Sequence, residues 1–278
     1  MSSDTSVVRF EDVSLHFGDT PALDHVSFSM GPGETRVVFG AAGSGKTILL
    51  KVAVGLQKPD SGRVFLFGND ITHANERELF DLRARVGILF QEGALFDSLT
   101  IADNVGYPLE NQHVLQTVAA GAERRSNEDR VRETLRFVEL EHTLDKFPSE
   151  LSGGMRRRVG IARAVVTQPE LVLYDSPTAG LDPITAHTII SLILKERDTR
   201  NTASIMVTHR YQDGQLMANF RYNPNSGDIE PAPRGSEETV DTKFLIMREG
   251  RLVFEGTEQE FLAHPDEYVQ KFARPGAS

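Results

Sequence analysis

The stretch Gly40-Ala-Ala-Gly-Ser-Gly-Lys-Thr47 combines residue types that bind phosphate, and it directly follows the apolar run 37–39. Glycines let backbone N–H groups approach phosphate oxygens, and the N-terminus of the helix expected at 48–56 adds a positive dipole. A glycine-rich turn without a ligand is the alternative, but the context of strand, loop and helix favours a nucleoside triphosphate. The contacts expected from the chain are Gly40, Ala41, Ala42, Gly43, Ser44, Gly45, Lys46, Thr47 and Ile48.

Several polar residues are candidates for the chemistry of this nucleotide. Lys46 is expected to reach the β- and γ-phosphates, and Thr47 and Asp175 are expected to bind Mg²⁺. Gln91 follows the apolar run 86–90 and could bind the metal or orient water, although a lone glutamine there commonly has no such role. His209 follows the run 203–207 and could contact the γ-phosphate, although a lone histidine more often forms structural hydrogen bonds.

A second potential anion site lies at Leu151-Ser-Gly-Gly-Met155, where another helix is expected to begin. Ser152 is well placed as the N-cap, and Gly153 and Gly154 leave backbone N–H groups free at the helix start. One nucleotide does not obviously need both sites from one molecule. A nucleotide held between two chains is therefore an attractive arrangement, and a two-fold dimer would provide two such sites.

The remaining patterns indicate the elements that position these residues. Short alternating runs in residues 7–39 predict an antiparallel sheet, and Phe17 at a strand end is either a core residue or a platform for adenine. Residues 93–109 are unusually apolar, which predicts internal packing and a partner-facing groove. Val131, Leu135 and Val138 have the spacing of a helix packing face.

Composition limits the classes of function. The chain has 278 residues, 39% of them hydrophobic, which suits one large domain or two subdomains. A net charge of −10 gives no general surface for nucleic acid, and Arg156-Arg157-Arg158 is the densest basic cluster. The absence of cysteine excludes disulfides and thiolate metal sites. We see no signal peptide and no apolar run of about 18 residues, so a membrane role is expected to require a partner.

Six motifs occur in the order seen in ATP-binding subunits of ABC transporters: the phosphate loop, Gln91, LSGGM, LVLYD, the loop 178–182 and His209. The resemblance covers residues from about 7 to 210 and resumes at 244–257. It implies an α/β fold with a RecA-like P-loop NTPase core, a mainly parallel sheet, an antiparallel β subdomain and a helical subdomain. The implied boundaries are 1–35 for part of the β subdomain, 36–94 and 166–210 for the core, 95–165 for the helical subdomain, and 244–278 for a C-terminal hairpin and helix.

The same resemblance implies a function and an assembly. It implies an ATPase that uses ATP and Mg²⁺ and forms a head-to-tail homodimer. Ser152, Gly153 and Gly154 of one chain would close over the ATP of the other, with Asp182 at the dimer contact. Phe17 matches the position at which the family stacks an aromatic ring on adenine.

A finer resemblance lies in residues 89–109, LFQEGALFDSLTIADNVGYPL, and in LDPITA. These segments are similar to Mla-type ATPases, which pair with MlaE-like permeases and MCE proteins to move phospholipids between bacterial membranes. This implies a peripheral subunit on the cytoplasmic face of the inner membrane, with residues after Gln91 docking on an integral-membrane permease. A soluble ABC protein acting on DNA or ribosomes fits poorly, because such proteins generally carry two cassettes, long coiled coils or cysteine-based metal sites.

Two positions depart from the family pattern. Ser176 stands where a glutamate normally polarises the attacking water, and a serine hydroxyl has too little basicity to replace it. This predicts ATP binding and dimerisation with slow hydrolysis, or alternatively a nucleotide-dependent binding module with little or no turnover. Residues 211–243 form an insertion rich in Pro, Gly, Asn and acidic residues, which predicts a solvated, flexible loop, with a partner-binding arm as the alternative.

Overall fold

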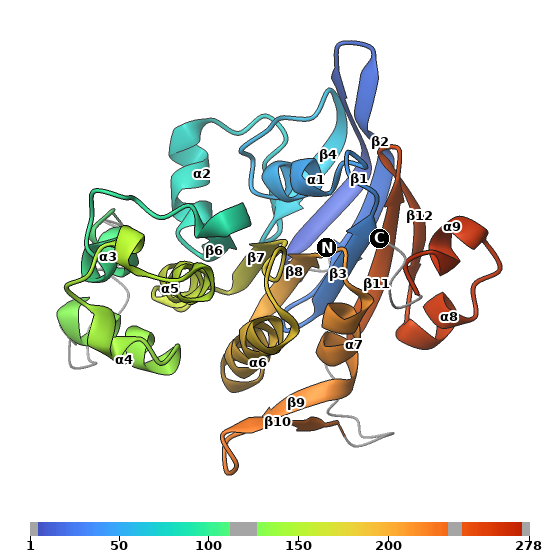
Figure 1. Cartoon of the computed structure of the whole chain (residues 1–278). Coiled ribbons are helices and arrows are strands. Elements are labelled where there is room, and N and C mark those ends of the chain that lie inside the picture. Colours follow the sequence, from blue (N-terminus) through green and yellow to red (C-terminus); the bar gives the residue numbers. More distant parts are fainter. Residues whose placement is uncertain (1–4, 112–126, 233–240, 274–278) are drawn as a thin grey trace.

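The computed structural model describes residues 5–111, 127–232 and 241–273, and its elements form three connected parts. A six-stranded sheet with helices on both faces lies at the centre, as Figure 1 shows. A four-stranded antiparallel sheet lies at the top of that view, and a group of helices lies at the left. The predicted α/β architecture, with its parallel core, antiparallel β part and helical part, is confirmed.

The central sheet has the strand order β12-β11-β3-β8-β7-β6. All neighbouring pairs are parallel except β11 and β12, which form the predicted C-terminal hairpin at the edge of the sheet. The strands are β3 (Thr35–Gly40), β6 (Val86–Leu89), β7 (Leu171–Asp175), β8 (Ala203–Val207), β11 (Thr242–Arg248) and β12 (Arg251–Gly256).

Side chains of the core strands alternate between two hydrophobic clusters, because successive residues of a strand point to opposite faces. In β7, Leu171 and Leu173 pack with helix α1 (Lys46–Ala53) and the antiparallel sheet. Val172 and Tyr174 pack instead with α5 (Gly153–Val165), α6 (Pro183–Arg200) and α7 (Tyr211–Asn219). Burial on both faces explains why β7 is apolar from Leu171 to Tyr174.

The antiparallel sheet has the order β2-β1-β4-β5. Its strands are β1 (Val8–Phe17), β2 (Thr20–Met30), β4 (Ser61–Leu66) and β5 (Asn69–Asp70), and α2 (Glu76–Arg83) follows. The assignment of residues 36–94 to the core is wrong for 61–70, because β1 has two edges and β4 pairs with the one that β2 leaves free. This sheet therefore combines segments from both sides of the phosphate loop.

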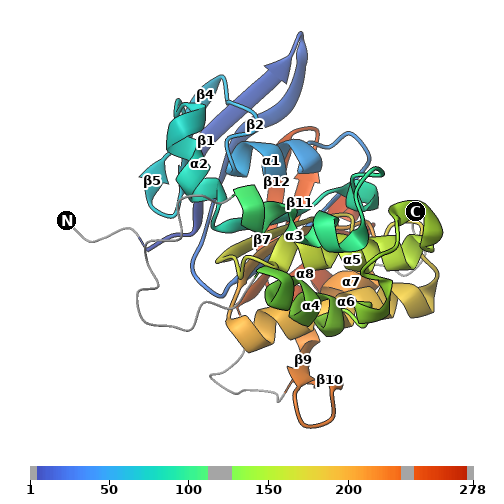
Figure 2. The same cartoon turned by 90° about the vertical axis from the view of Figure 1, so that its left-hand side faces the viewer.

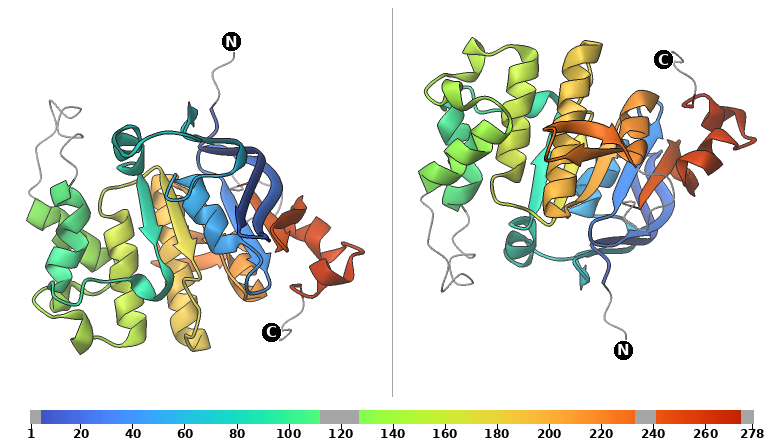
Figure 3. Two further views of the ribbon diagram at one scale, coloured as in Figure 1. Left: turned by 90° about the horizontal axis from the view of Figure 1, so that it is seen from above. Right: turned by 90° about the horizontal axis from the view of Figure 1, so that it is seen from below.

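The helical part lies beside β6 and includes α3 (Ile101–Asn111), α4 (Asn127–Phe137), two short 3-10 turns and α5. Figure 3 shows these helices on the side of the molecule opposite the C-terminal helices α8 (Glu258–Leu262) and α9 (Glu267–Gln270), and Figure 2 views the molecule from the side of α3 to α5. Val131, Leu135 and Val138 are buried, which confirms the predicted packing face. None of the helices in the described ranges combines the length and apolar character needed to cross a membrane.

The prediction of a flexible loop over 211–243 is wrong for residues 211–232, and 233–240 lie outside the described residues. Residues 211–219 form α7, and β9 (Phe220–Asn223) and β10 (Asp228–Pro231) form an antiparallel hairpin. The hairpin packs on α6 and buries Ile229 in the main hydrophobic cluster. The polar residues that suggest a loop are concentrated in the turn at 224–227, and the two flanking segments form strands.

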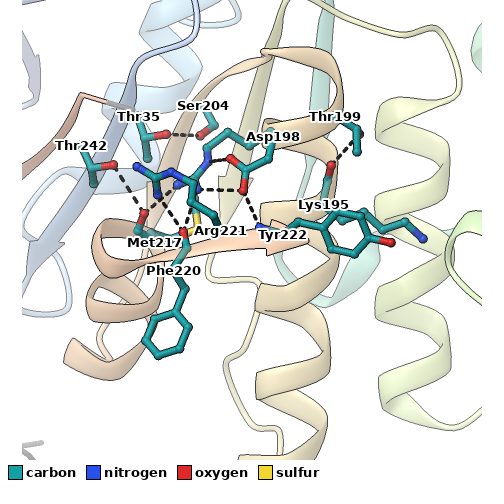
Figure 4. Close-up of polar contacts among 11 residues, drawn as sticks. Thr35, Lys195, Asp198, Thr199, Ser204, Met217, Phe220, Arg221, Tyr222 and Thr242 are labelled. Atoms are coloured by element: carbon teal, nitrogen blue, oxygen red, sulfur yellow. Dashed lines mark hydrogen bonds and ion pairs between the residues drawn. The ribbon is translucent and has the colours of Figure 1, made fainter. Parts of the chain in front are cut away.

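The hairpin is anchored by polar contacts, shown in Figure 4. Arg197 on α6 has 1% of its side chain exposed; it forms an ion pair with Asp198 at 2.6 Å and donates to the Met217 and Phe220 carbonyls at 2.6 and 3.0 Å. The Tyr222 N–H donates to the Asp198 carboxylate at 2.8 Å. These bonds satisfy backbone groups where α7 ends and β9 begins, and they hold this junction on α6.

Candidate nucleotide site

The phosphate loop connects β3 to α1 and depends on glycine at its C-terminal end. Gly45 has φ of 101°, and a Cβ there would collide with the carbonyl oxygen of Ala22 on β2. Gly43 has φ of 75° with open space where a Cβ would project. Backbone in this left-handed region strongly favours glycine. The loop therefore keeps the shape of a cradle at the start of α1.

Lys46 lies inside this cradle with only 6% of its surface exposed. Its ammonium donates to the carbonyl oxygens of Gly40 and Ala41 at 2.9 and 2.7 Å. Burial lowers the pKa of Lys46 to about 8, although the nearby Asp175 carboxylate acts in the opposite direction. The loop thus holds a desolvated cation among its backbone groups, which is a favourable environment for phosphate.

Thr47, Asp175 and Ser176 meet where α1 faces the end of β7. The Thr47 hydroxyl donates to Oδ2 of Asp175 at 2.9 Å, and the Ser176 hydroxyl lies 3.2 Å from Oδ1 of the same carboxylate. Asp175 and Ser176 are 6% and 8% exposed. Ser176 has φ of 53°, a strained conformation of the kind concentrated at functional sites.

His209 contacts the phosphate loop, whereas the Gln91 side chain is exposed and makes no hydrogen bond with other described residues. His209 follows β8, and its pKa is lowered by burial and by the Lys46 ammonium, while a hydrogen bond with the Gly40 backbone acts in the opposite direction. His209 is thus tied to the first residue of the loop. Gln91 begins the 3-10 turn Gln91–Gly93 after β6, and its exposed side chain forms no hydrogen bond with other described residues.

Phe17 and the second glycine-rich segment lie at other places on the surface. Phe17 ends β1 and is 52% exposed, which leaves its ring accessible. Ser152 is the N-cap of α5 and accepts a hydrogen bond from the Met155 N–H at 3.3 Å, as predicted. A Cβ at Gly153 would meet open space. Within the described part of one chain, no hydrogen bond connects this segment to the phosphate loop.

Asp182 is the N-cap of α6. Its carboxylate accepts from the Ile184 and Thr185 N–H groups at 3.0 Å each and from the Thr185 hydroxyl at 2.6 Å. These hydrogen bonds lower its pKa. Ile184 beside it is 81% exposed, so an apolar side chain adjoins a charged helix cap on this surface.

A sequence profile of the family described as "ABC transporter" matches residues 23–179, which is more than half of the chain. The chain belongs to the ABC transporter ATP-binding family. Its members include ATP-hydrolysing transporter subunits, which bind ATP with Mg²⁺, dimerise and pair with membrane permease subunits.

Two relatives of this ABC cassette differ in the cargo that their names give. The methionine import ATP-binding protein MetN of Corynebacterium diphtheriae is 33% identical over 268 residues, 95% of this chain and 70% of that protein. The intermembrane phospholipid transport system ATP-binding protein MlaF of Haemophilus influenzae is 30% identical over 270 residues, 97% of this chain and 90% of that protein.

Solved structures share the fold of this cassette. A dimeric ATP-binding cassette in a post-hydrolysis state with ADP and Pi has a TM-score of 0.73 at 25% identity, covering 90% of this chain and 98% of that one. A nucleotide-free cassette from an ABC transporter has a TM-score of 0.72 at 26% identity, covering 97% and 99%.

The residues of this ABC cassette fit a magnesium nucleotide. Thr47 and Asp175 place two oxygen ligands side by side, and these two side chains would hold Mg²⁺ beside the nucleotide phosphates. Lys46 and the glycine-rich cradle provide the positive charge and the close backbone approach that phosphate requires. The bound metal would neutralise developing charge on the phosphates.

Sequence reasoning missed three contacts of this cassette. Arg157 on α5 donates to the Ala179 carbonyl at 3.0 Å, so one member of the predicted basic cluster holds the segment after Ser176. The Tyr268 hydroxyl on α9 accepts from the Ala41 N–H at 3.3 Å. Asp213 on α7 accepts from two threonine hydroxyls near the site. Three of these four hydrogen bonds join residues at least 22 positions apart, and the fourth, from Thr208 to Asp213, spans five residues between the end of β8 and α7. No local pattern indicates them.

Proposed function

We propose that this ABC ATPase drives phospholipid transport through an MlaE-like permease, together with MCE-type lipid-binding proteins. In this proposal it is a peripheral subunit on the cytoplasmic face of the inner membrane of a bacterium. The observation that carries the proposal is the likeness to MlaF, which extends over 97% of this chain and 90% of that protein. The resemblance of residues 89–109 and of LDPITA to Mla-type ATPases supports the same assignment.

In the proposed nucleotide complex, the backbone of residues 40–48 and Lys46 hold the phosphates, while Phe17 stacks on adenine. Thr47 and Asp175 bind Mg²⁺, and Gln91 and His209 approach the metal and the γ-phosphate. Ser152, Gly153 and Gly154 of a second copy close over the nucleotide in a head-to-tail dimer, with Asp182 at the contact. Three observations support this: the accessible Phe17 ring, the open surface at Gly153 and the exposed Ile184 beside Asp182.

Ser176 makes hydrolysis slow in this proposal. The side chain is a hydroxyl that contacts the Asp175 carboxylate, so it offers no free base to the attacking water. Loss of a general base typically slows a reaction by about 10²–10⁴-fold. A serine in place of the usual glutamate leaves Lys46, Thr47 and Asp175 present. We therefore expect ATP binding to be retained.

The permease is proposed to dock in a groove of about 450 Å³ between α2, β6 and the helical part. Four partly exposed aromatic side chains line it: Phe80, Phe90, Phe96 and Tyr107. The last two pack on each other with ring centroids 4.7 Å apart. Exposed aromatic rings around a groove favour an amphipathic helix as the ligand, and a cytoplasmic helix of the permease fits this description.

Two other functions compete with phospholipid transport. Methionine import is favoured by the MetN relatives, one of which, from Rhodococcus jostii, is 39% identical over 271 residues. A nucleotide-dependent binding module without useful turnover is favoured by Ser176. Both alternatives use the same nucleotide site, so only the permease, the cargo and the turnover number distinguish them.

Purification of the tagged full chain from membranes of its own host tests the proposal. We expect an MlaE-like permease and MCE-type proteins to be identified with it by mass spectrometry. In proteoliposomes the complex should transfer fluorescent phospholipid with ATP and should not take up labelled methionine. Recovery of a methionine permease with methionine uptake would overturn the proposed cargo, and transfer without phosphate release would favour the binding module.

A further inference from the structure

A buried carboxylate, that of Asp213, forms hydrogen bonds with two segments of the nucleotide site. Asp213 on α7 is 1% exposed. Its Oδ2 atom accepts from the Thr178 hydroxyl at 2.5 Å and from the Thr208 hydroxyl at 2.6 Å. The nearest cation is Arg210, whose Nε lies 3.7 Å from Oδ1. Asp213 is thus satisfied mainly by two neutral hydroxyl groups.

The two threonines belong to the segments that carry Ser176 and His209. Thr178 lies two residues after Ser176, in the loop between β7 and α6, and Thr208 directly precedes His209. The Thr208 hydroxyl also accepts from the Arg210 N–H at 3.1 Å. One carboxylate oxygen therefore joins the chain after Asp175 to the turn that presents His209.

Burial of this carboxylate is unfavourable for stability by itself. Desolvation raises the pKa of Asp213, while the two threonine hydroxyls act in the opposite direction. The ion pair with Arg210 at 3.7 Å offsets only part of the cost of burying this charge, and an apolar side chain of similar size would avoid that cost. The carboxylate instead determines the relative position of two loops, because the threonine of each loop donates a short hydrogen bond to the same oxygen atom.

We propose that Asp213 is a positioning residue for ATP hydrolysis, which sets the placement of the Ser176 segment relative to His209. The inference rests on the proposed function, in which both segments face the γ-phosphate. Small displacements of groups around a reacting phosphate slow the reaction strongly, whereas the phosphate loop that binds ATP makes no contact with Asp213. The predicted signature is a loss of turnover without a loss of ATP affinity.

Isosteric substitutions in the full chain test this inference. Thr178→Val and Thr208→Val each remove one hydroxyl, Asp213→Leu removes the shared acceptor, and Asp213→Asn retains an oxygen that can accept both bonds. Thr134→Val is the matched control, because its buried hydroxyl donates to the Arg130 carbonyl on α4, away from the site. Each variant is made in the natural sequence and with Ser176→Glu, where faster turnover is expected.

The readouts are the ATP dissociation constant and the single-turnover hydrolysis rate. We expect about 10-fold slower hydrolysis for each Thr→Val variant and about 100-fold for Asp213→Leu, with ATP affinity within about twofold of the parent. Asp213→Asn should recover most of the rate. Adding both Thr→Val changes to Asp213→Leu should slow it no further, because all three act through one contact.

Two results separate failure of the inference from failure of the proposed function. Unchanged hydrolysis in Thr178→Val, Thr208→Val and Asp213→Leu would overturn the positioning role, as would a parallel loss of ATP affinity in these variants. Absence of ATP binding by the parent protein, or of hydrolysis in both the natural and the Ser176→Glu backgrounds, would contradict the proposed function and the inference with it.

Discussion

Thr47 and Asp175 are 128 residues apart in sequence, yet the threonine hydroxyl donates to the aspartate carboxylate across 2.9 Å. The contact joins the first residues of α1 to the end of β7, because the loop and this strand end lie at the same edge of a parallel sheet. It brings together the two side chains that are proposed to bind Mg²⁺. The contact thus holds the two proposed metal ligands together in the chain itself.

Removal of either metal ligand should weaken ATP binding. We expect Thr47→Val to bind Mg-ATP about 10-fold more weakly, since a hydrogen bond or ligand to a charged group contributes about 1.5–3 kcal/mol. Chelation of Mg²⁺ by EDTA should weaken ATP binding more in the parent than in Thr47→Val, which keeps Asp175 as a metal ligand. Isothermal titration calorimetry measures both effects. Equal sensitivity of the two proteins to EDTA would argue against Thr47 as a metal ligand.

The pH dependence of ATP binding should report Lys46. Its pKa of about 8 in the free protein means that the ammonium loses its proton as pH rises above 8. The anionic triphosphate favours the ammonium, so binding takes up a proton above this pH and affinity falls, by at most about 10-fold per pH unit. Calorimetry in buffers of different ionisation enthalpy measures the uptake. A flat affinity between pH 7 and 9.5 would contradict this prediction.

Ser176→Glu should accelerate steady-state hydrolysis by about 10²–10⁴-fold, because it supplies the missing general base. The matched control is Ser176→Gln, which has the same length without the basicity and should remain slow. Release of phosphate from purified protein with Mg-ATP measures the rate. Parental turnover as fast as that of Ser176→Glu would mean that another group activates water.

The contacts of Arg197 with the β9–β10 hairpin should stabilise the fold without changing ATP affinity. Arg197→Met removes the ion pair with Asp198 and the hydrogen bonds to the Met217 and Phe220 carbonyls, and breaking a buried pair in this way lowers the free energy of unfolding by about 3–5 kcal/mol. Arg221→Met is the comparison, because the Nη2 of Arg221 is buried without a partner among the described residues and burial lowers its pKa to about 10.

Arg221→Met should cost less, about 1 kcal/mol, because it removes one hydrogen bond, from Nη1 of Arg221 to the Phe220 carbonyl at 2.7 Å, together with a poorly compensated charge. Urea denaturation followed by circular dichroism measures both variants, and both should bind ATP like the parent. Equal destabilisation by the two substitutions would contradict the distinction between these arginines.

The sequence predicted the features that depend on local spacing and on strand ends. The loop 40–47 and the cap at Ser152 follow from short patterns, and Asp175 from its place after a buried strand. The sequence places the β4–β5 segment in the core, whereas β4 pairs with β1 of the antiparallel sheet, because the pairing of distant strands depends on the tertiary fold. The hairpin at 220–231 was missed because its Pro- and Asn-rich turn dominates the composition. The Thr178–Asp213–Thr208 contact involves three separate segments, which no periodicity connects.

Equilibrium dialysis of the full chain against labelled ATP with Mg²⁺ tests the central claim most directly. The account predicts saturable binding by the parent protein and a loss of about 100-fold or more in Lys46→Ala, because a buried charge paired with phosphate contributes strongly to affinity. Thr134→Val, altered outside the site, should bind like the parent. Absence of ATP binding by the parent, or equal binding by Lys46→Ala, would contradict the account.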